Sequence, residues 1–368
     1  MVAVGPSSLP RPPRRARGRL PTYAADVPRP LFPRQPEGGR FSLSALDTRR
    51  SSLAAGNEAS SLGSADSGAA HGGMAARPAP GEILRAYVAL CKPRIIELLL
   101  ITAVPVLFLA DRGLPSLLDA AVVVAGGTLA AGSANALNCY IDRDIDQVMR
   151  RTRGRPLATH TVSPRAALIF GTVMGVVSVG LFAAAANLLA AALTLGAILY
   201  YVVVYTMLLK RRTSQSTLWG GICGAAPVLI AWATVRGSLS WPPFLLFLVV
   251  FFWQPAHFWA LAVKFKEDYR SVDIPMLPVV ASLRRVLTES LVDSWLMVAA
   301  SVAVWPLATG PLYGVAAILL GGAFLAEVHR MHWRAVRGRP VQTMRLFHES
   351  NIYLTLLFAA LAADALLH

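Results

Sequence analysis

Nine long apolar stretches constrain this chain more than any other feature of its sequence. Each has about twenty residues, the length that an α-helix needs to cross the hydrocarbon core of a bilayer. They are rich in Ala, Leu, Gly and Val and show no polar alternation, which argues against the strands of a β-barrel. We expect an all-α integral membrane protein with nine transmembrane helices, at residues 91–110, 116–141, 165–186, 188–209, 217–235, 241–263, 288–308, 311–329 and 349–367.

The composition of the chain supports a membrane protein. Of its 368 residues, 55% are hydrophobic and only 15% are charged, and the mean hydropathy is +0.52, far from an ordinary soluble domain. The formal net charge of +15 does not indicate nucleic acid binding, because the basic residues lie between apolar stretches and not on one soluble surface. The cysteines Cys91, Cys139 and Cys223 lack the spacing of a metal site and are interpreted as small buried residues.

Residues 1–80 form a different region. They are rich in Pro, Ser, Gly, Ala and Arg and contain no apolar stretch long enough for a helix core. Such a composition is typical of a disordered segment. We therefore divide the chain into a disordered tail at residues 1–80 and a nine-helix membrane domain at residues 81–368.

Positive charge in the connecting loops predicts the orientation. Nineteen Lys and Arg residues lie in or beside the loops after the second, fourth, sixth and eighth stretches, whereas the other four loops hold only Arg112 and Arg236. Because Lys and Arg are retained on the cytoplasmic side, we expect a cytoplasmic N-terminus. The expected location is the bacterial inner membrane, or the mitochondrial inner membrane in a eukaryote, with the active site on the cytoplasmic side.

Acidic and amide side chains end the second stretch with helical spacing. Asn135, Asn138, Asp142 and Asp146 lie three or four residues apart, so a helix would place them along one stripe. Ionisable groups at membrane depth are costly and usually face a bundle interior or a water-filled cavity. The alternative is that the two acids neutralise nearby arginines such as Arg143 at a solvated helix end.

These residue types suit a site for a metal ion and a diphosphate. Carboxylates and an amide oxygen are ligands that Mg²⁺ prefers, and Mg²⁺ commonly takes one or two carboxylates together with substrate phosphates. Arg151 and Arg155 follow in a basic loop, and arginine clamps phosphate oxygens through its forked guanidinium. Other basic residues of the same face are either topology signals or further diphosphate contacts: Lys92, Arg94, Lys210 and Arg211.

A second polar loop follows the sixth stretch. It contains Lys264 and Asp268, four residues apart, and lies on the same predicted side as the first loop. These two residues can simply form an ion pair with each other. Because both loops follow spans of one bundle on one side, the other interpretation is that they close over a single site.

His257 stands in an aromatic part of the sixth stretch, beside Trp253, Phe258 and Trp259. A histidine in an apolar helix is commonly a hydrogen-bonded packing residue, and aromatic side chains near a membrane surface commonly form an interfacial belt. The functional interpretation places His257 near a planar or iron-containing substrate and the aromatic faces near a carbocation, whose charge they attract. The residues alone leave both interpretations open.

Together these motifs resemble the UbiA superfamily of intramembrane prenyltransferases, and within it the branch whose acceptor is heme. The resemblance extends from about residue 81 to the C-terminus. The segments that carry it are KPR at 92–94, NALNCYIDRDID at 135–146, RTRGRPL at 151–157, YTMLLKRRT at 205–213, WQPAHFWALAVKFKEDYR at 253–270, IPMLP at 274–278 and LFHESNIYL at 346–354.

The resemblance implies nine helices around a central cavity, with two aspartate-rich motifs under cytoplasmic loops. It assigns Asn138, Asp142 and Asp146 to the first motif and Asp268 to the second, as ligands of Mg²⁺ whose number stays open. Where the superfamily has an acid at the start of the second motif, this chain has Lys264, which is expected to neutralise part of the diphosphate charge. The substrate contacts expected on this basis are Lys92, Arg94, Asn135, Arg151, Arg155, Lys210, Arg211, Trp253, His257 and Trp259.

The reaction implied by the resemblance is farnesyl transfer from farnesyl diphosphate to a vinyl group of heme B, with addition of water, to give heme O and diphosphate. Heme B is then a substrate and not a cofactor, and membrane lipid surrounds the enzyme. The enzyme that converts heme O to heme A and proteins of oxidase assembly are candidate partners. A UbiA-type enzyme with an aromatic or quinone-precursor acceptor is the nearest alternative, and a transporter with intramembrane carboxylates is a more distant one.

Overall fold

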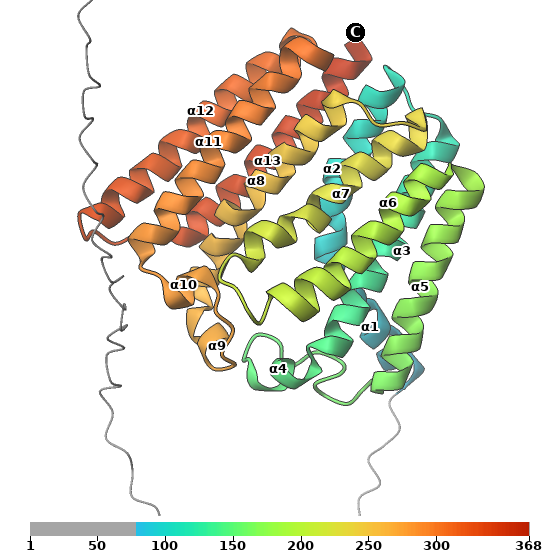
Figure 1. Ribbon diagram of the computed structural model, residues 1–368, viewed down its shortest axis with the longest axis vertical. Coiled ribbons are helices and arrows are strands. Elements are labelled where there is room, and N and C mark those ends of the chain that lie inside the picture. Colours follow the sequence, from blue (N-terminus) through green and yellow to red (C-terminus); the bar gives the residue numbers. More distant parts are fainter. Residues whose placement is uncertain (1–78, 368) are drawn as a thin grey trace, which may run out of the picture. The chain divides into compact units, whose positions relative to one another are not determined.

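The computed structural model describes residues 79–367. Within this range the chain is helical and contains no β-strand. The predicted disordered tail at residues 1–80 lies outside the described residues, apart from Ala79 and Pro80 at the start of the first helix, and stays a prediction. Figure 1 shows long helices side by side, with short helices grouped at one end of the bundle and the C-terminal end of the last helix at the other.

Nine helices of the described range are long and apolar enough to cross a membrane. This number confirms the prediction. Their bounds are α2 Pro93–Asp111, α3 Leu117–Ile141, α5 Pro164–Ala185, α6 with its continuation η1 Leu188–Leu209, α7 Ser216–Arg236, α8 Trp241–Lys264, α11 Leu283–Ala308, α12 Pro311–Val336 and α13 Thr343–Leu367.

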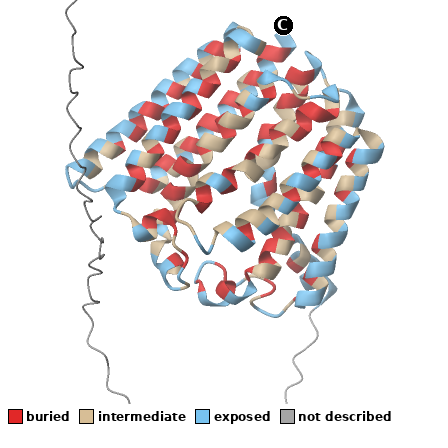
Figure 2. Cartoon of the chain, viewed as in Figure 1, coloured by how far each residue is buried: buried red, intermediate tan, exposed pale blue. Residues whose placement is uncertain are grey.

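Large apolar side chains cover the outer faces of these helices. Val176, Leu188 and Leu319 are exposed by 68%, 78% and 66%. Figure 2 shows exposed residues along the outside of the bundle and buried residues where helices face one another. Water makes such apolar exposure unfavourable, whereas lipid tails accept it. The protein is therefore an integral membrane protein.

Three helices extend past the predicted apolar stretches. α11 begins at Leu283 instead of 288, α12 ends at Val336 instead of 329, and α13 begins at Thr343 instead of 349. The added turns are charged and are held by pairs one helical turn apart, such as Arg285 with Glu289 at 2.8 Å. Hydropathy detects only the part of a helix that lies in lipid, so it does not find these polar ends.

A separate helix, α1 at Pro80–Cys91, precedes the first span. Lys92 then adopts a left-handed backbone conformation with φ of 55°, and the following proline starts α2 at the helical position where its missing N–H is not needed. The inner side chains of α1, Ala86 and Leu90, are buried in a cluster with Ala136 of α3. The predicted span at 91–110 therefore begins two residues later than expected.

The fourth span is not a uniform α-helix. α6 covers Leu188–Leu199, and the remaining turns, Tyr200–Leu209, form a π-helix, η1. The backbone N–H of Lys210 bonds to the carbonyl of Tyr205, five residues earlier, at 2.9 Å. π-helical turns are rare in proteins as a whole, but many of those that occur lie at functional sites. This one was not predicted, because its residues show the same apolar pattern as an α-helix.

Three short helices gather at one end of the bundle: α4 at Arg143–Val148, α9 at Lys266–Arg270 and α10 at Leu277–Val280 (Figure 1). They belong to the loops after the second and sixth spans. One buried apolar cluster joins both loops and the end of α8, through Ile145, Met149, Ala262, Tyr269, Ile274 and Met276. The two loops therefore pack against each other.

Close packing of α11 and α12 gives a test of the bundle. A methyl group added at Gly314 of α12 would overlap the indole ring of Trp305 in α11, whereas one added at Gly322 of the same helix meets no described atom within 4 Å. We expect Gly314→Ala to destabilise the purified protein by about 1–3 kcal/mol, because the indole ring must move, and Gly322→Ala to have no such effect. Thermal unfolding in detergent measures both, and equal midpoints for the two variants would contradict this packing.

Candidate active site at the loop end of the bundle

The predicted stripe of acids and amides is buried. Asn135, Asn138, Asp142 and Asp146 have exposed fractions of 3%, 3%, 0% and 2%. α3 ends one residue before Asp142 and α4 begins one residue after it, but the backbone N–H groups of Asp142 and Asp146 still bond to carbonyls four residues earlier, each at 2.9 Å. The stripe therefore continues across the helix junction, and its carboxylates do not lie at a solvated helix end.

Asp142 contacts three side chains. Its Oδ2 accepts hydrogen bonds from Lys210 Nζ and, at 2.8 Å, from Asn138 Nδ2. The guanidinium of Arg211 lies 3.8 Å from Oδ1, and Oδ1 is buried with no hydrogen-bond partner in the described part of the chain. A buried carboxylate oxygen without a donor is unfavourable, so this oxygen is suited to an incoming cation.

Asp146 is paired with Arg155. One guanidinium nitrogen of Arg155 donates to both carboxylate oxygens, at 2.9 and 2.7 Å. The side chain of Asp146 is 3% exposed and that of Arg155 is 25% exposed, so the pair is largely shielded from water, which would weaken it. Arg155, a predicted diphosphate contact, is therefore bound to a member of the acid stripe.

Lys92 and Thr206 fix the amide of Asn138. The Oδ1 of Asn138 accepts a hydrogen bond from Lys92 Nζ at 2.7 Å, and its Nδ2 donates to Thr206 Oγ1 at 3.2 Å as well as to Asp142. Burial lowers the pKa of Lys92 to about 8. Because both amide atoms are engaged, Asn138 orients Asp142 here, and its predicted role as a metal ligand requires Lys92 to release the amide oxygen.

Arg211 and Asp144 form an outer ion pair. Two guanidinium nitrogens of Arg211 donate to the two carboxylate oxygens of Asp144, at 2.8 and 2.7 Å. These hydrogen bonds lower the pKa of Asp144 to about 2. Arg94, by contrast, is exposed on the first turn of α2 and forms no ion pair within residues 79–367. The structure therefore brings Arg211 to the edge of the stripe and leaves Arg94 exposed without an ion pair in the described range.

The loop after the sixth span meets the first loop through Arg151. The backbone N–H of Arg151 donates to Asp268 at 3.2 Å, and its guanidinium donates to the hydroxyl of Tyr269 at 3.0 Å. The same guanidinium lies 5.2 Å from the centre of the Phe265 ring. Lys264 is exposed and, among the described residues, has no ion pair with Asp268. The two loops close on each other as predicted, and the alternative of a Lys264–Asp268 pair is not found.

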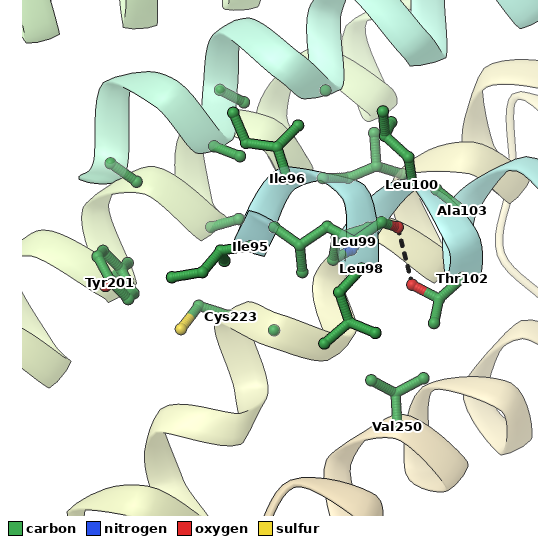
Figure 3. Close-up of a pocket in the computed structure, with 18 of the residues that line it drawn as sticks. Ile95, Ile96, Leu98, Leu99, Leu100, Thr102, Ala103, Tyr201, Cys223 and Val250 are labelled. Atoms are coloured by element: carbon green, nitrogen blue, oxygen red, sulfur yellow. Dashed lines mark hydrogen bonds between the residues drawn. The ribbon is translucent and has the colours of Figure 1, made fainter. Parts of the chain in front are cut away.

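An apolar cavity of about 290 Å³ opens inside the bundle. Figure 3 shows part of its wall, formed there by Leu98, Leu99, Cys223 and Val250. Its lining also includes Asn135, the first member of the buried stripe. The cavity and the stripe share this residue, so an apolar chamber lies next to the buried carboxylates, as the family resemblance implies.

Trp253 and His257 of α8 both line this cavity. The imidazole of His257 stacks between the rings of Trp253 and Phe347, with centroid distances of 4.2 and 4.4 Å. Its Nδ1 hydrogen-bonds to Ser350 Oγ of α13 at 2.8 Å, and Trp253 Nε1 donates to the carbonyl of Ser350 at 2.7 Å. His257 is thus packed and hydrogen-bonded on one edge while it also faces the chamber.

Trp259 lies elsewhere. Its side chain is 1% exposed and packs in a separate cluster with Leu277 and Val286, and the cavity lining does not include it. Two residues after His257, it lies on a different face of the same helix. This position argues against the predicted contact between Trp259 and a substrate.

Several residues of the site were not predicted. They share polar or aromatic side chains that contact the stripe, the cavity or the loop junction: Tyr201, Tyr205, Thr206, Gln254, Tyr269 and Ser350. All of them except Tyr201 lie in the segments that carry the family resemblance. The polar or aromatic character of these residues within those segments could therefore have identified them as site residues.

Comparison with known proteins shows the family to which the chain belongs. Residues 99–351 match the model of the UbiA prenyltransferase family. A protoheme IX farnesyltransferase of Salinispora tropica is 59% identical over 298 residues, covering 80% of this chain and 93% of that protein, and one of Nocardioides sp. is 54% identical over 304 residues, covering 81% and 96%. The solved structure of a UbiA homolog from Archaeoglobus fulgidus bound to DMAPP and Mg²⁺ has the same fold, with a TM-score of 0.52, 18% identity and coverage of 75% of this chain and 98% of that chain. This chain belongs to the UbiA prenyltransferase family.

Proposed function

We infer that the protein transfers the farnesyl group of farnesyl diphosphate to a vinyl group of heme B, with addition of water, and releases heme O and diphosphate. The observation that carries this inference is the identity of more than half of the aligned residues with two protoheme IX farnesyltransferases over nearly their whole length. Buried carboxylates beside an apolar cavity provide the two environments that a prenyl diphosphate needs. The enzyme that converts heme O to heme A and oxidase assembly proteins are the partners expected for this product.

The acid stripe suits Mg²⁺. Mg²⁺ keeps several waters and commonly binds through one or two carboxylates together with substrate phosphates. Asp142 offers a buried oxygen without a hydrogen-bond partner, and in the described part of the chain no group of three or more acidic, histidine or cysteine side chains forms a complete cage. Asp142 and Asp146 are the proposed ligands, supported by Asn138 and Asp268, and a bound ion would supply charge stabilisation to the leaving diphosphate.

Basic side chains around the stripe are proposed to hold the diphosphate. Lys210 forms an ion pair with Asp142 and Arg155 forms one with Asp146. Arg151 lies where the two loops meet. Preorganised cations stabilise developing negative charge more than water does. These three residues therefore neutralise the leaving group as the bond between carbon and oxygen breaks, and Lys92 and Arg211 add positive potential at its edge.

The apolar cavity is proposed to hold the farnesyl chain and to exclude bulk water. Tyr201, Tyr205 and Trp253 belong to its lining, and their ring faces attract the positive charge of an allylic cation. Exclusion of water protects that cation until the vinyl group reacts. Charge separation thus occurs at the stripe, and carbon–carbon bond formation occurs in the chamber.

The loop end of the bundle is proposed to face the cytoplasm. α4 and α9 and the loops around them carry many of the basic residues, whereas the loops between the other ends of the spans carry only Arg112 and Arg236. Retention of positive loops on the cytoplasmic side gives this orientation. Diphosphate is then released into the cytoplasm, where it is soluble.

The proposed function is tested with the purified full chain in nanodiscs, incubated with heme B, farnesyl diphosphate and Mg²⁺. We expect a porphyrin that is heavier by one farnesyl group and one water, detected by mass spectrometry. A parallel reaction with 4-hydroxybenzoate as the acceptor is expected to give no product. Prenylation of that acceptor and not of heme would assign the protein to another branch of the family.

Removal of divalent ions is expected to stop the reaction. An excess of chelator should lower the initial rate at least about a hundredfold, the loss typical when one major electrostatic contact to a developing anion is removed, and added Mg²⁺ should restore it. The measurement is the rate of farnesylated porphyrin formation. A full rate in excess chelator would remove the metal from the proposal and leave the basic residues alone on the diphosphate.

A further inference from the structure

Ser350 determines which nitrogen of His257 carries the proton. The hydroxyl of Ser350 donates to the carbonyl of Phe347 at 2.8 Å, so its oxygen accepts the hydrogen bond from His257 Nδ1. In the neutral imidazole the proton is therefore on Nδ1, and Nε2 has a free lone pair. Within residues 79–367 no group donates a hydrogen bond to Nε2.

The surroundings of His257 leave only that nitrogen edge for the cavity. Trp253 and Phe347 cover the two faces of the imidazole, at interplanar angles of 21° and 29°. The Nδ1 edge is held by α13 through Ser350. Because His257 belongs to the cavity lining, the remaining edge of its ring, which carries Nε2, faces the cavity.

Gln254 presents a second hydrogen-bond acceptor to the same cavity. Its Nε2 donates to the carbonyl of Gly221 at 3.0 Å, so the amide oxygen is the end left for the chamber, whose lining includes Gln254. His257 follows three residues later on α8, which places both side chains on one face of the helix. Three further polar side chains of the lining, by contrast, donate to backbone carbonyls of their own helices: Thr102, Thr194 and Cys223.

We propose that His257 is the catalytic base of the water-addition step and that Gln254 and His257 together orient the water. A water molecule that donates one hydrogen to Gln254 Oε1 and the other to His257 Nε2 directs its oxygen lone pair away from both, toward the middle of the cavity. Two neighbouring acceptors in a largely apolar wall thus hold one water as a nucleophile while bulk water stays out. This assignment rests on the proposed function.

The chemical step balances without an oxidant or a reductant. The terminal carbon of the heme vinyl group bonds to C1 of the farnesyl chain as the bond from C1 to the diphosphate oxygen breaks, and the diphosphate leaves with that electron pair. The inner vinyl carbon becomes a cation. The oriented water bonds to this carbon through its oxygen and transfers one proton to His257 Nε2, which leaves a hydroxyl group on the product. The imidazolium returns its proton to water when the product is released.

The size of the cavity favours this role over binding of the heme iron by His257. At about 290 Å³ the cavity is at the lower end of pockets that bury a small ligand, which span roughly 300–1,000 Å³, and it must also hold the farnesyl chain. A space of this size accepts the vinyl edge of a porphyrin beside that chain more readily than the whole macrocycle. With the vinyl edge inserted, the iron at the centre of the porphyrin is far from His257 Nε2.

The test is the product formed by His257→Asn. Asparagine keeps an N–H group for Ser350 at the Nδ1 position and lacks Nε2. With heme B, farnesyl diphosphate and Mg²⁺, we expect farnesylated porphyrin in which the ratio of hydrated to unhydrated product falls by about a hundredfold or more. The unhydrated alkene forms because the cation then loses a proton from the adjacent carbon, the former terminal carbon of the vinyl group. His329→Asn is the matched control, since His329 also lies in a span with Nδ1 held by a carbonyl, of Leu325 at 2.9 Å, but outside the cavity lining, and it should give wild-type product.

Two further variants keep the proposal testable if His257→Asn does not fold. Ser350→Ala frees the imidazole to adopt either tautomer, and Gln254→Leu removes the second acceptor; each is expected to lower the hydrated fraction severalfold. A wild-type hydrated fraction in His257→Asn, or in both of these variants, overturns the proposal. A changed Soret band of bound heme in His257→Asn also overturns it and assigns His257 to the iron. Wild-type enzyme that forms no farnesylated porphyrin refutes the proposed function itself.

Discussion

Asp142→Asn is expected to lower the rate of farnesyl transfer to below about one thousandth of the wild-type rate. The carboxylate of Asp142 is fully buried, and its Oδ1 has no hydrogen-bond partner in the described chain. A neutral amide oxygen holds a cation far more weakly than a carboxylate does, and the charge stabilisation that is lost, several kcal/mol, corresponds to a factor of this size. The measurement is the initial rate of farnesylated porphyrin formation from heme B and farnesyl diphosphate.

The controls separate loss of chemistry from loss of folding. Asp142→Asn leaves Lys210 beside a neutral side chain, whereas the double variant with Lys210→Met removes both charges, a replacement that buried ion pairs often tolerate. We expect the double variant to unfold no lower than the single variant and to stay inactive. Asp144→Asn changes an exposed carboxylate two residues away and should keep most of the activity. Activity near that of the wild type in Asp142→Asn would refute its role at the diphosphate.

Arg155→Leu is expected to destabilise the protein by about 3–5 kcal/mol, because it leaves the buried carboxylate of Asp146 without its partner. If Asp146 binds Mg²⁺, the positive charge of the ion replaces the missing charge of Arg155. A ligand that binds only the folded state raises the unfolding midpoint, so Mg²⁺ with inorganic diphosphate should stabilise this variant more than the wild type. Thermal unfolding in detergent, with and without these additions, measures the effect.

Arg153→Leu is the matched control for this variant. Arg153 belongs to the same loop, is exposed, and has no ion pair within the described range. It should unfold like the wild type with or without Mg²⁺. A midpoint of Arg155→Leu that does not respond to Mg²⁺ and diphosphate would contradict a metal at Asp146, while leaving its ion pair with Arg155 as a structural contact.

Much of this architecture could be predicted because its determinants are local. The length and continuity of the apolar stretches predict nine spans, and the spacing from Asn135 to Asp146 predicts one buried stripe. Both follow from the geometry of a single helix in lipid. The meeting of the two loops was also expected from topology, since both follow spans that end on one side, and the contact between Arg151 and Asp268 bears this out.

Other features depend on contacts between distant segments and could not be read from spacing. The pairing of Asp142 with Lys210, 68 residues later, and of His257 with Ser350, 93 residues later, follows from the packing of different spans. For the same reason sequence proximity groups Trp259 with His257, whereas its ring packs with Leu277 in a separate cluster. Hydropathy and periodicity describe which face of a helix is buried, but not which neighbour buries it.

The π-helix η1 makes the fourth span sensitive to its exact number of residues. Deleting one residue between Tyr200 and Leu209 would either tighten the wide turns toward an α-helix or rotate the residues after the deletion about the helix axis. Either change disturbs the approach of Lys210 to Asp142, although composition and hydropathy would hardly change. Chimeras and homologues that exchange this span must therefore preserve its length, and single-residue indels there should be selected against more strongly than substitutions between apolar side chains.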